Sequence, residues 1–479
     1  MTFSQPALVS QINAMNTPLT GLEPLRVLAS DEMMGRGTIR PEIQMAARYI
    51  GEAFRAAGLQ EVPHTNDYFQ SFTIQMITSG KTGSLQIGDL HFDLGKEWVQ
   101  MNGTDMAINA PVIFLRYGSK ADFEKAAVRG KIVVTDMGST DSSNFMDGFD
   151  LLETKQKWAT EKGALALIER FKKSEVPWDG VLQYAGSERP SINEQKNNIP
   201  TVIIRDSTSA LPALLKDKDA TGSISVSGTQ IKNVLAKNVL GWIEGTDPLL
   251  KKEFILLSAH YDHLGVAPKP EMQEGKLDSI FNGARDNAIG SAAVIDAARY
   301  FSKHPAKRSI LCITYAAEEI GLIGSKYFAD HPPIPISAIK YNLNIDNASY
   351  NDTTIVTVIG LGRTSADRHI EKACKQYGLT ADPDPAPDQN FFDRSDNVSL
   401  ASLGIPAPTF SLGMRKFDDE INKRYHQLSD EVGNFNLRYA LKYINSFILA
   451  AVYIANDPVQ PTWVMGDKYE SAWKALYKK

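Results

Sequence analysis

The second half of the chain alternates continuous apolar runs with helical segments, and this alternation constrains the fold most strongly. A helical spacing of apolar residues is found in AIGSAAVIDAARYF (288–301), and a shorter helix is expected at 320–328. Strands that are apolar on both faces and are separated by helices predict a mostly parallel sheet with helices on both faces, an α/β fold. The apolar runs that read as strands are FILLSA (254–259), SILCITYA (309–316), YNLNI (341–345) and TIVTVIG (354–360).

The chain is long enough for more than one packed unit. With 479 residues it exceeds the usual size of a single domain, so two or three units are expected. Between residues 110 and 234, short β-like runs alternate with polar loops and one helical segment at 151–162. We therefore expect residues 110–234 to form an inserted β-rich domain, and residues 1–109 and 235–479 to form the two parts of the main domain.

The local structure of two segments near the N-terminus can be predicted. The apolar residues of EIQMAARYIGEAFRAAGL (42–59) fall at helical spacing, and Gly58 predicts the end of that helix. The preceding segment LASDEMMGRGT (28–38) is polar and contains glycine. We expect it to be a loop that packs on the core and takes no part in a site.

Composition excludes several classes of protein. A net charge of -5 argues against a nucleic-acid binder, which would show a basic excess. No run approaches the roughly 20 apolar residues of a membrane span, and the nearest, 443–455, predicts a buried C-terminal helix. Two cysteines make no disulfide framework, and Cys312 lies within an apolar run that predicts a core position.

Side chains of the kinds that bind metal ions follow the predicted strands or lie in nearby loops. Open α/β sheets bind their ligands outside the carboxyl ends of the strands, so we expect these side chains to converge at one edge of the sheet. They are His260 after FILLSA, Glu318 and Glu319 after SILCITYA, Asp346 after YNLNI, Asp286 in the loop GARDNAIG, and His426 in the loop RYHQLSD.

Each of these residues alone has an ordinary structural explanation. His260 could be a satisfied core or surface histidine, Asp286 a helix cap, and the Glu318-Glu319 pair an exposed helix start. Together, at one sheet edge, they are hard to explain without a function, because buried carboxylates are costly unless they are paired or bound to metal. The pattern therefore predicts a metal centre.

Three carboxylates and two imidazoles suit two zinc ions. One carboxylate must bridge the ions, and Asp286, in a glycine-flanked loop, is the natural candidate. Such a pair of ions, about 3.5–4 Å apart, activates a shared water. Only one of the two adjacent glutamates needs to bind metal, so the other is free to act as the general base. Asp262 can accept the second N–H of the His260 imidazole.

The sequence resembles the di-zinc aminopeptidase family, which also includes glutamate carboxypeptidases and the transferrin receptor. The resemblance covers nearly the whole chain. Residues 28–38 are similar to the N-terminal lead-in of the family, and the inserted region, with GKIVVTDM and IPTVIIR, resembles a protease-associated domain. The motifs that carry the resemblance, in family order, are AHYDHLG, NGARDNAIGSA, AAEEIGLIGSKYF, NIDN, FDRSDN and RYHQLSDE.

The resemblance implies a zinc exopeptidase fold with two zinc ions per chain and assigns a role to each motif residue. Glu318 is then the general base, and Asp262 the partner of His260. Tyr425 is similar to a tyrosine that supports the oxyanion in some relatives, and a structural role for it is the alternative. The Asp286–Asn287 peptide bond is expected to be cis. The ligands of one zinc are His260, Asp286 and Asp346, and those of the other are Asp286, Glu319 and His426.

Two positions depart from this pattern or stay open. Many relatives read SDH where this chain reads Ser395-Asp396-Asn397, in a loop that borders the substrate pocket, so the preferred substrate is not implied. Arg394 and Asp396 either shape that pocket or pair with each other. His263 is expected to point away from the site, because it lies three residues after a ligand at the end of a strand.

The function expected from the resemblance is a metallo-aminopeptidase acting on peptide substrates. A carboxypeptidase or dipeptidase of the same fold is an open alternative, because the motifs do not determine which end of a peptide is recognised. A receptor without catalysis is disfavoured because the ligands and Glu318 are all present, and a single-zinc glutaminyl cyclase because the dinuclear set is complete. The N-terminus shows no signal peptide, yet the resemblance favours a periplasmic or secreted protein over a cytoplasmic one. The oligomeric state is not implied.

Overall fold

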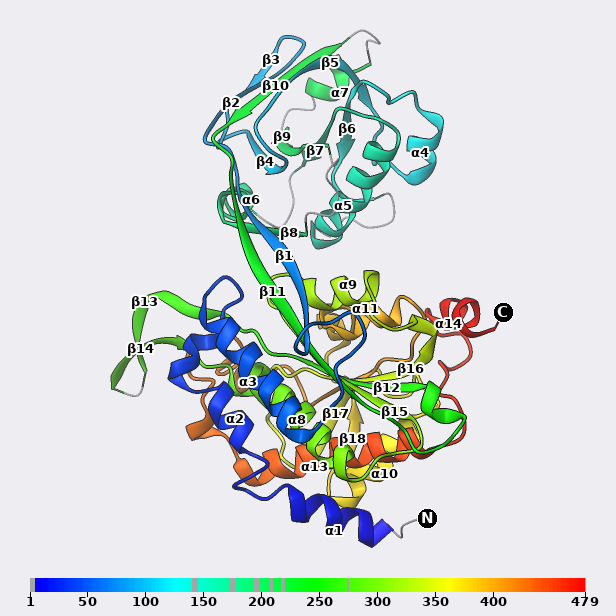
Figure 1. Ribbon diagram of the computed structural model, residues 1–479. Helices are drawn as coiled ribbons and strands as arrows, with labels where there is room; N and C mark the ends of the chain where they lie inside the picture. The colour runs from blue at the N-terminus through cyan, green and yellow to red at the C-terminus, as the bar shows by residue number, and fades with distance from the viewer. Residues whose placement is uncertain are drawn as a thin grey trace. The chain divides into compact units, whose positions relative to one another are not determined.

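The computed structural model describes residues 5–139, 145–172, 177–192, 199–206, 210–216, 220–273 and 275–478 (Figure 1). The chain divides into two compact units. The first unit combines Met1–Phe72 with Leu235–Lys479, and the second is Thr73–Val234. Strands β1 (Phe69–Thr78) and β11 (Gln230–Ile243) carry the chain from one unit to the other and back.

The first unit is built on a mixed sheet whose centre is parallel. Strands β15, β12, β16 and β19 are neighbours in that order and run parallel. Outside them, β11 is antiparallel to β15, and β17 is antiparallel to β19 and parallel to β18. These strands are β12 (Phe254–His260), β15 (Ser309–Tyr315), β16 (Ile339–Ile345), β17 (Ile355–Ile359), β18 (Thr380–Pro383) and β19 (Thr409–Leu412).

The central strands are buried because helices cover both faces of this sheet (Figure 1). Every residue of β15 is buried, which explains why its sequence is continuously apolar. One face carries a set of helices that includes α13; on it the ring of Phe410 in β19 lies 5.8 Å from that of Phe447 in this helix. These helices are α2 (Glu23–Leu28), α3 (Glu42–Ala57), α8 (Ile289–Lys303), α10 (Asp367–Gln376) and α13 (Leu437–Asn456), and α1 (Gln5–Met15) contacts α13.

The other face carries α9 (Ile323–Asp330), α11 (Asn397–Ala401) and α14 (Glu470–Tyr477). Phe328 of α9 and Leu400 of α11 belong to one buried cluster with strand residues such as Leu256. The expected C-terminal helix is α13, which is largely buried. In the described part of the chain, no helix is both long enough and apolar enough to cross a membrane.

The second unit has its own sheet, in the order β3-β2-β10-β5-β6-β7-β9-β4. The expected runs form β5, β6, β7 and β9, which are parallel neighbours, and the expected helix is α5. The strands are β2 (Thr82–Ile87), β3 (Leu90–Phe92), β4 (Trp98–Asn102), β5 (Met106–Phe114), β6 (Ile132–Asp136), β7 (Ala166–Phe171), β9 (Thr201–Arg205) and β10 (Thr221–Ser227), with β8 (Arg189–Ile192) paired to β1. The helices are α4 (Lys120–Lys125), α5 (Phe145–Glu161), α6 (Trp178–Gly186) and α7 (Ala210–Leu214).

The second unit begins at Thr73 and not at residue 110, and it ends at Val234. The expected start was too late because residues 73–109 contain strands that pair only within this unit. Strand β2 pairs with β10, and β4 pairs with β9, so both are held by residues far downstream. Their short sequences, TGSLQI and WVQMN, do not by themselves indicate these partners.

We expect Asn238→Leu to destabilise the first unit. Asn238 in β11 is fully buried; its side-chain amide donates to the carbonyl oxygen of Gly324 (2.8 Å), and its oxygen accepts from the backbone N–H of Ala316 (3.2 Å). Leucine would remove these bonds and a third to the Gln70 side-chain oxygen (3.0 Å), and it would take away the acceptor of the Ala316 N–H, at a cost of about 1–3 kcal/mol. Urea unfolding measures the change, with the exposed Asn422→Leu as the control; equal stability of the two variants would contradict the expectation.

Candidate functional site

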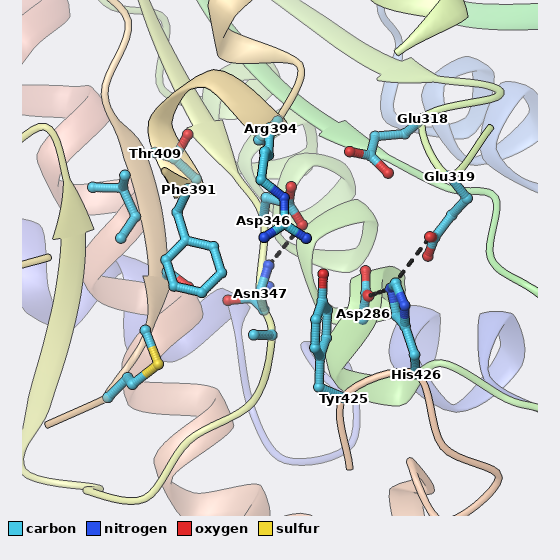
Figure 2. A pocket seen from close by; sticks show the side chains of 15 residues that line it. Asp286, Glu318, Glu319, Asp346, Asn347, Phe391, Arg394, Thr409, Tyr425 and His426 are labelled. Atoms are coloured by element: carbon cyan, nitrogen blue, oxygen red, sulfur yellow. Dashed lines mark hydrogen bonds and ion pairs between the residues drawn. The ribbon is translucent and has the colours of Figure 1, made fainter. Parts of the chain in front are cut away.

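The carboxyl ends of the central parallel strands bring four of the expected residues to one edge of the sheet. His260 is the last residue of β12, Glu318 and Glu319 follow β15, and Asp346 follows β16. Strands β12, β15 and β16 are parallel neighbours, so their ends lie together. Figure 2 shows three of these carboxylates facing one pocket.

Two loops complete the cluster. Asp286 lies in the irregular turn Ala284–Ala288 that precedes α8, and His426 lies in the loop after the short helix α12 (Asp419–Asn422). Figure 2 shows both side chains beside Glu319. The structure therefore brings together all six residues that the sequence marked as metal ligands or general base.

The two carboxylate oxygens of Asp286 face two different imidazoles. Its Oδ1 lies 3.3 Å from Nε2 of His260, and its Oδ2 lies 3.2 Å from Nε2 of His426. Nε2 of His260 is also 3.2 Å from Oδ1 of Asp346, and Nε2 of His426 is 3.3 Å from Oε2 of Glu319. Asp286 thus stands between two sets of donor atoms.

These spacings fit the donor atoms of two tetrahedral ions. Zinc bonds of 2.0–2.1 Å to nitrogen and oxygen place two ligands of one ion roughly 3.3 Å apart. Glu318 fits less well, because its Oε2 is 4.0 Å from Nε2 of His260. Among the described residues, two groups of three donors lie within 4.8 Å of one another: His260, Glu318 and Asp346, and His260, Asp286 and Glu319.

Asp262 does not hold His260 as expected. Nδ1 of His260 lies 3.1 Å from the backbone carbonyl oxygen of Asp262 and 3.8 Å from its carboxylate. The carboxylate instead accepts from the backbone N–H groups of Glu318 (3.1 Å) and Glu319 (3.3 Å), and from the hydroxyl of Thr38 (2.9 Å). Asp262 therefore fixes the turn that presents both glutamates, because its carboxylate accepts from both of their backbone amides.

The expectation that His263 points away from the site is wrong. Its imidazole is buried, and its Nδ1 lies 2.6 Å from Oε1 of Glu319. The alternation of side chains along a strand does not continue past His260, where β12 ends. The ring therefore turns toward the loops that carry the ligands.

Asp430, in the motif RYHQLSDE, supports the turn that carries Asp286. Its carboxylate accepts from the backbone N–H groups of Arg285 (2.9 Å) and Asp286 (3.2 Å), and from the Arg285 guanidinium (2.8 Å). The Asp286–Asn287 peptide bond is cis, as the resemblance implied. The Asn287 amide in turn donates to the carbonyl oxygen of Ile345 at 2.8 Å, which ties this turn to the end of β16.

Arg36 is a supporting residue that sequence reasoning missed. It lies in the segment expected to be an inert loop, at the end of a 3-10 helix, Asp31–Arg36, and it is fully buried. Its guanidinium donates to the backbone carbonyl oxygens of Tyr261 (2.7 Å), Asn282 (2.7 Å) and Gly283 (3.0 Å), and to that of Leu28. Burial lowers the pKa of Arg36 to about 10, so it stays charged at neutral pH and holds the segments on both sides of the site.

The charges at the site are strongly coupled. Burial works to raise the pKa of Asp286, but hydrogen bonds from His260 and His426 hold it below its usual range. Burial works to lower the pKa of His260, but Glu318 and Asp346 raise it well above normal. Burial also raises the pKa of Glu318 well above that of an ordinary glutamate, and the like charges of the nearby Asp346 and Glu319 raise it further.

A pocket opens beside these residues, and Tyr425 contributes to its wall (Figure 2). The Tyr425 ring lies 4.0 Å from that of His426, and its hydroxyl points into the pocket. Burial, with a smaller effect of Asp286, raises the pKa of Tyr425, so the hydroxyl stays protonated and can donate a hydrogen bond. The remaining wall includes the apolar side chains of Ile359, Phe391 and Met414.

The loop that departs from the family pattern borders the pocket through Arg394 and Ser395. Arg394 lines the pocket and is exposed, and within the described ranges no ion pair joins it to Asp396. Asp396 is 1% exposed, and burial raises its pKa to about 7. Asn397 is buried, does not line the pocket, and donates to the carbonyl oxygen of Ala407 at 3.1 Å. The change from histidine to asparagine therefore falls on a packing position.

Comparison with known proteins gives the following. Residues 238–452 match the sequence profile of a family described as peptidase family M28. The aminopeptidase YwaD of Bacillus subtilis is 24% identical over 363 residues, which cover 73% of this chain and 68% of that protein. A probable leucine aminopeptidase 2 of Aspergillus oryzae is 24% identical over 259 residues, and the match covers 49% of each chain. The structure of an aminopeptidase from Aneurinibacillus sp. strain AM-1 has a TM-score of 0.55 at 23% identity and covers 94% of this chain and 97% of that chain, a likeness of fold.

Metal binding is expected to release protons. Burial works to lower the pKa of His426, but its hydrogen bonds with Asp286 and Glu319 raise it to about 10. At neutral pH the imidazole therefore carries a proton that a metal ion must displace, and the apparent affinity should rise about tenfold per pH unit for each proton released. Calorimetric titration of the metal-free protein in buffers of different ionisation enthalpy counts these protons; a binding heat that is the same in every buffer would contradict the expectation.

Proposed function

We propose, on the premise that residues 238–452 belong to peptidase family M28, that the chain is a zinc-dependent aminopeptidase that hydrolyses N-terminal residues from peptides. The observation that carries this proposal is the position of Asp286, whose two oxygens lie 3.3 and 3.2 Å from the Nε2 atoms of His260 and His426. A bridging carboxylate between two sets of nitrogen and oxygen donors is the arrangement that a dinuclear zinc site needs.

Two zinc ions would be held by five side chains. Bound there, the metal pair supplies Lewis acidity to a water and to the carbonyl oxygen of the scissile peptide bond. The protein holds the donors in place through Asp430, Asp262 and Arg36, so that little rearrangement is needed on binding. His260, Asp286 and Asp346 would hold one ion, and Asp286, Glu319 and His426 would hold the other.

Glu318 is the general base in this proposal. Its carboxylate is 4.0 Å from Nε2 of His260, so it lies beside the donor set and is free to exchange a proton. Burial, with the like charges of Asp346 and Glu319, raises its pKa, which brings a glutamate closer to the pH at which a base works best. Glu318 takes a proton from the attacking water and returns it to the leaving amine.

Tyr425 stabilises the oxygen that gains negative charge. Its hydroxyl points into the pocket and remains protonated, so it can donate to the carbonyl oxygen as water adds to the carbonyl carbon and the oxygen becomes negatively charged. The apolar wall of Ile359, Phe391 and Met414 receives the side chain of the terminal residue. The carboxylates at the pocket favour a substrate that presents an ammonium group.

A carboxypeptidase or dipeptidase is the second candidate, and Arg394 is the observation that favours it. Its exposed guanidinium lines the same pocket, donates to the carbonyl oxygen of Gln389 at 3.2 Å, and forms no ion pair with any of the described carboxylates. A guanidinium without a carboxylate partner is the group best suited to bind a carboxylate at the C-terminal end of a short substrate. The two candidates differ in which end of the peptide must be free.

The second unit is a protease-associated domain in this proposal. Its parallel strands β5, β6, β7 and β9 lie in one sheet with antiparallel strands at both edges, which supports an independent α/β unit inserted into the peptidase. Its resemblance to such domains also supports a periplasmic or secreted location.

Chelation is expected to abolish hydrolysis, and zinc or cobalt to restore it. The test uses three matched peptides: one with both ends free, one acetylated at the N-terminus and one amidated at the C-terminus. Loss of cleavage on acetylation alone supports the aminopeptidase, and loss on amidation alone supports the carboxypeptidase. Hydrolysis that is indifferent to chelators would overturn the metal mechanism itself.

Glu318→Gln is expected to lower turnover by about 10²–10⁴, the usual contribution of a general base, while metal content stays near that of the wild type. Elemental analysis and initial rates on the same preparation separate the two effects. Glu319→Gln is the matched variant, since it removes a donor and should lose metal. If Glu318→Gln lost the metal instead, the roles of the two glutamates would be reversed.

A further inference from the structure

His263 is a buried titratable side chain that neither the motif residues nor the proposed mechanism uses. It follows His260 by three residues, and its side chain is fully buried. Nδ1 lies 2.6 Å from Oε1 of Glu319, which is a short hydrogen bond to a carboxylate. Because a carboxylate only accepts, Nδ1 carries the proton of this bond.

This hydrogen bond divides the two oxygens of Glu319 between two partners. Oε1 accepts from His263, and Oε2 lies 3.3 Å from Nε2 of His426. The first distance is too short for two donors of one zinc ion, which lie roughly 3.3 Å apart, whereas the second matches that spacing. His263 is therefore a hydrogen-bond donor to a ligand, and Glu319 presents one oxygen to the metal.

The surrounding backbone is arranged to seat this imidazole. The backbone N–H of His263 donates to the carbonyl oxygen of Arg36 at 3.3 Å, and the ring lies edge-on to that of His426, 5.9 Å between centroids. Gly283 has a φ of +56°, and a Cβ there would lie 2.5 Å from Cδ2 of the imidazole. The turn that carries Asp286 thus begins with a residue whose lack of a side chain leaves room for His263.

We propose that His263 is a positioning residue for the second metal. Its Nδ1–H holds Glu319 in the orientation in which Oε2 alone faces the ion shared by Asp286 and His426. Among the donors that would hold the first ion, Asp286 has its Oδ2 3.9 Å from Nδ1 of His263, which is beyond hydrogen-bond distance. This inference rests on the proposed dinuclear site, and it concerns only how one of its two ions is held.

The test compares two substitutions at one position. His263→Phe keeps a ring and removes the donor, and His263→Asn places an amide N–H near the position of Nδ1. Both are compared with His304→Phe, which changes a histidine at the end of α8, 5.0 Å from the Tyr300 ring and outside the site. Stepwise titration with Co²⁺, followed by its visible absorption and by calorimetry, gives a dissociation constant for each equivalent without reference to activity.

Loss of a hydrogen bond to a metal ligand typically weakens binding 10–100-fold, so His263→Phe should weaken one equivalent by that factor and leave the other unchanged. His263→Asn should keep both constants within about fivefold of the wild type, since the donor is retained. Asparagine is smaller than phenylalanine, so this result stands even if the phenylalanine variant fails to fold. Three results would overturn the inference. They are equal weakening of the binding of both Co²⁺ equivalents in His263→Phe, unchanged binding of both in that variant, or weakened binding of either equivalent in His263→Asn beyond fivefold.

The failure of this inference differs from the failure of the proposed function. If the wild type binds two equivalents and is active, but His263→Phe binds both as the wild type does, only the role of His263 is wrong. If the wild type binds no more than one equivalent, the dinuclear site is wrong and the role of His263 is overturned with it.

Discussion

The carboxylate of Asp286, held between two imidazoles, is the interaction on which the rest of the site depends. It is 3% exposed, and an isolated carboxylate at such a place would be too costly to keep. Its partners come from opposite ends of the motif set: His260 from a strand end and His426 from a loop far downstream. The supporting residues act mainly by fixing the backbone of the segments that carry the candidate ligands.

Those supporting contacts share one physical pattern, in which a buried charged side chain binds backbone groups. Asp262 accepts from two amides after β15, Asp430 accepts from two amides before α8, and Arg36 donates to carbonyl oxygens on three segments. Backbone groups in irregular turns have no partners in a helix or sheet, so charged side chains satisfy them instead. The ligand geometry is set by these turns and not by the strands alone.

Sequence reasoning predicted the parts of the structure that depend on local pattern. The strands β12, β15 and β16 are continuous apolar runs, and their parallel pairing follows from the helices between them. Once that pairing was expected, the convergence of His260, Glu319 and Asp346 followed from the direction of the strands. His426 was a candidate from its residue type alone, and the family motif gave it a definite role, because its loop has no regular spacing from any strand.

The features that the sequence did not predict depend on contacts between irregular segments that lie far apart in the chain. Arg36 bonds to Tyr261, which is 225 residues away, and no local pattern marks such a pair. His263 was misjudged because its direction is set by Gly283 and Glu319, not by strand alternation. The start of the second unit was missed for a similar reason, since β2 and β4 are recognisable only through β10 and β9.

The insertion of Thr73–Val234 also determines the order in which the peptidase can assemble as it is synthesised. Helix α3 is synthesised before the inserted unit, and its neighbour α8 is synthesised after it. The inserted unit contains all of its own sheet partners apart from the connecting strands and can fold first. In the nascent chain, the apolar face of α3 therefore remains without α8 until the inserted unit has been synthesised.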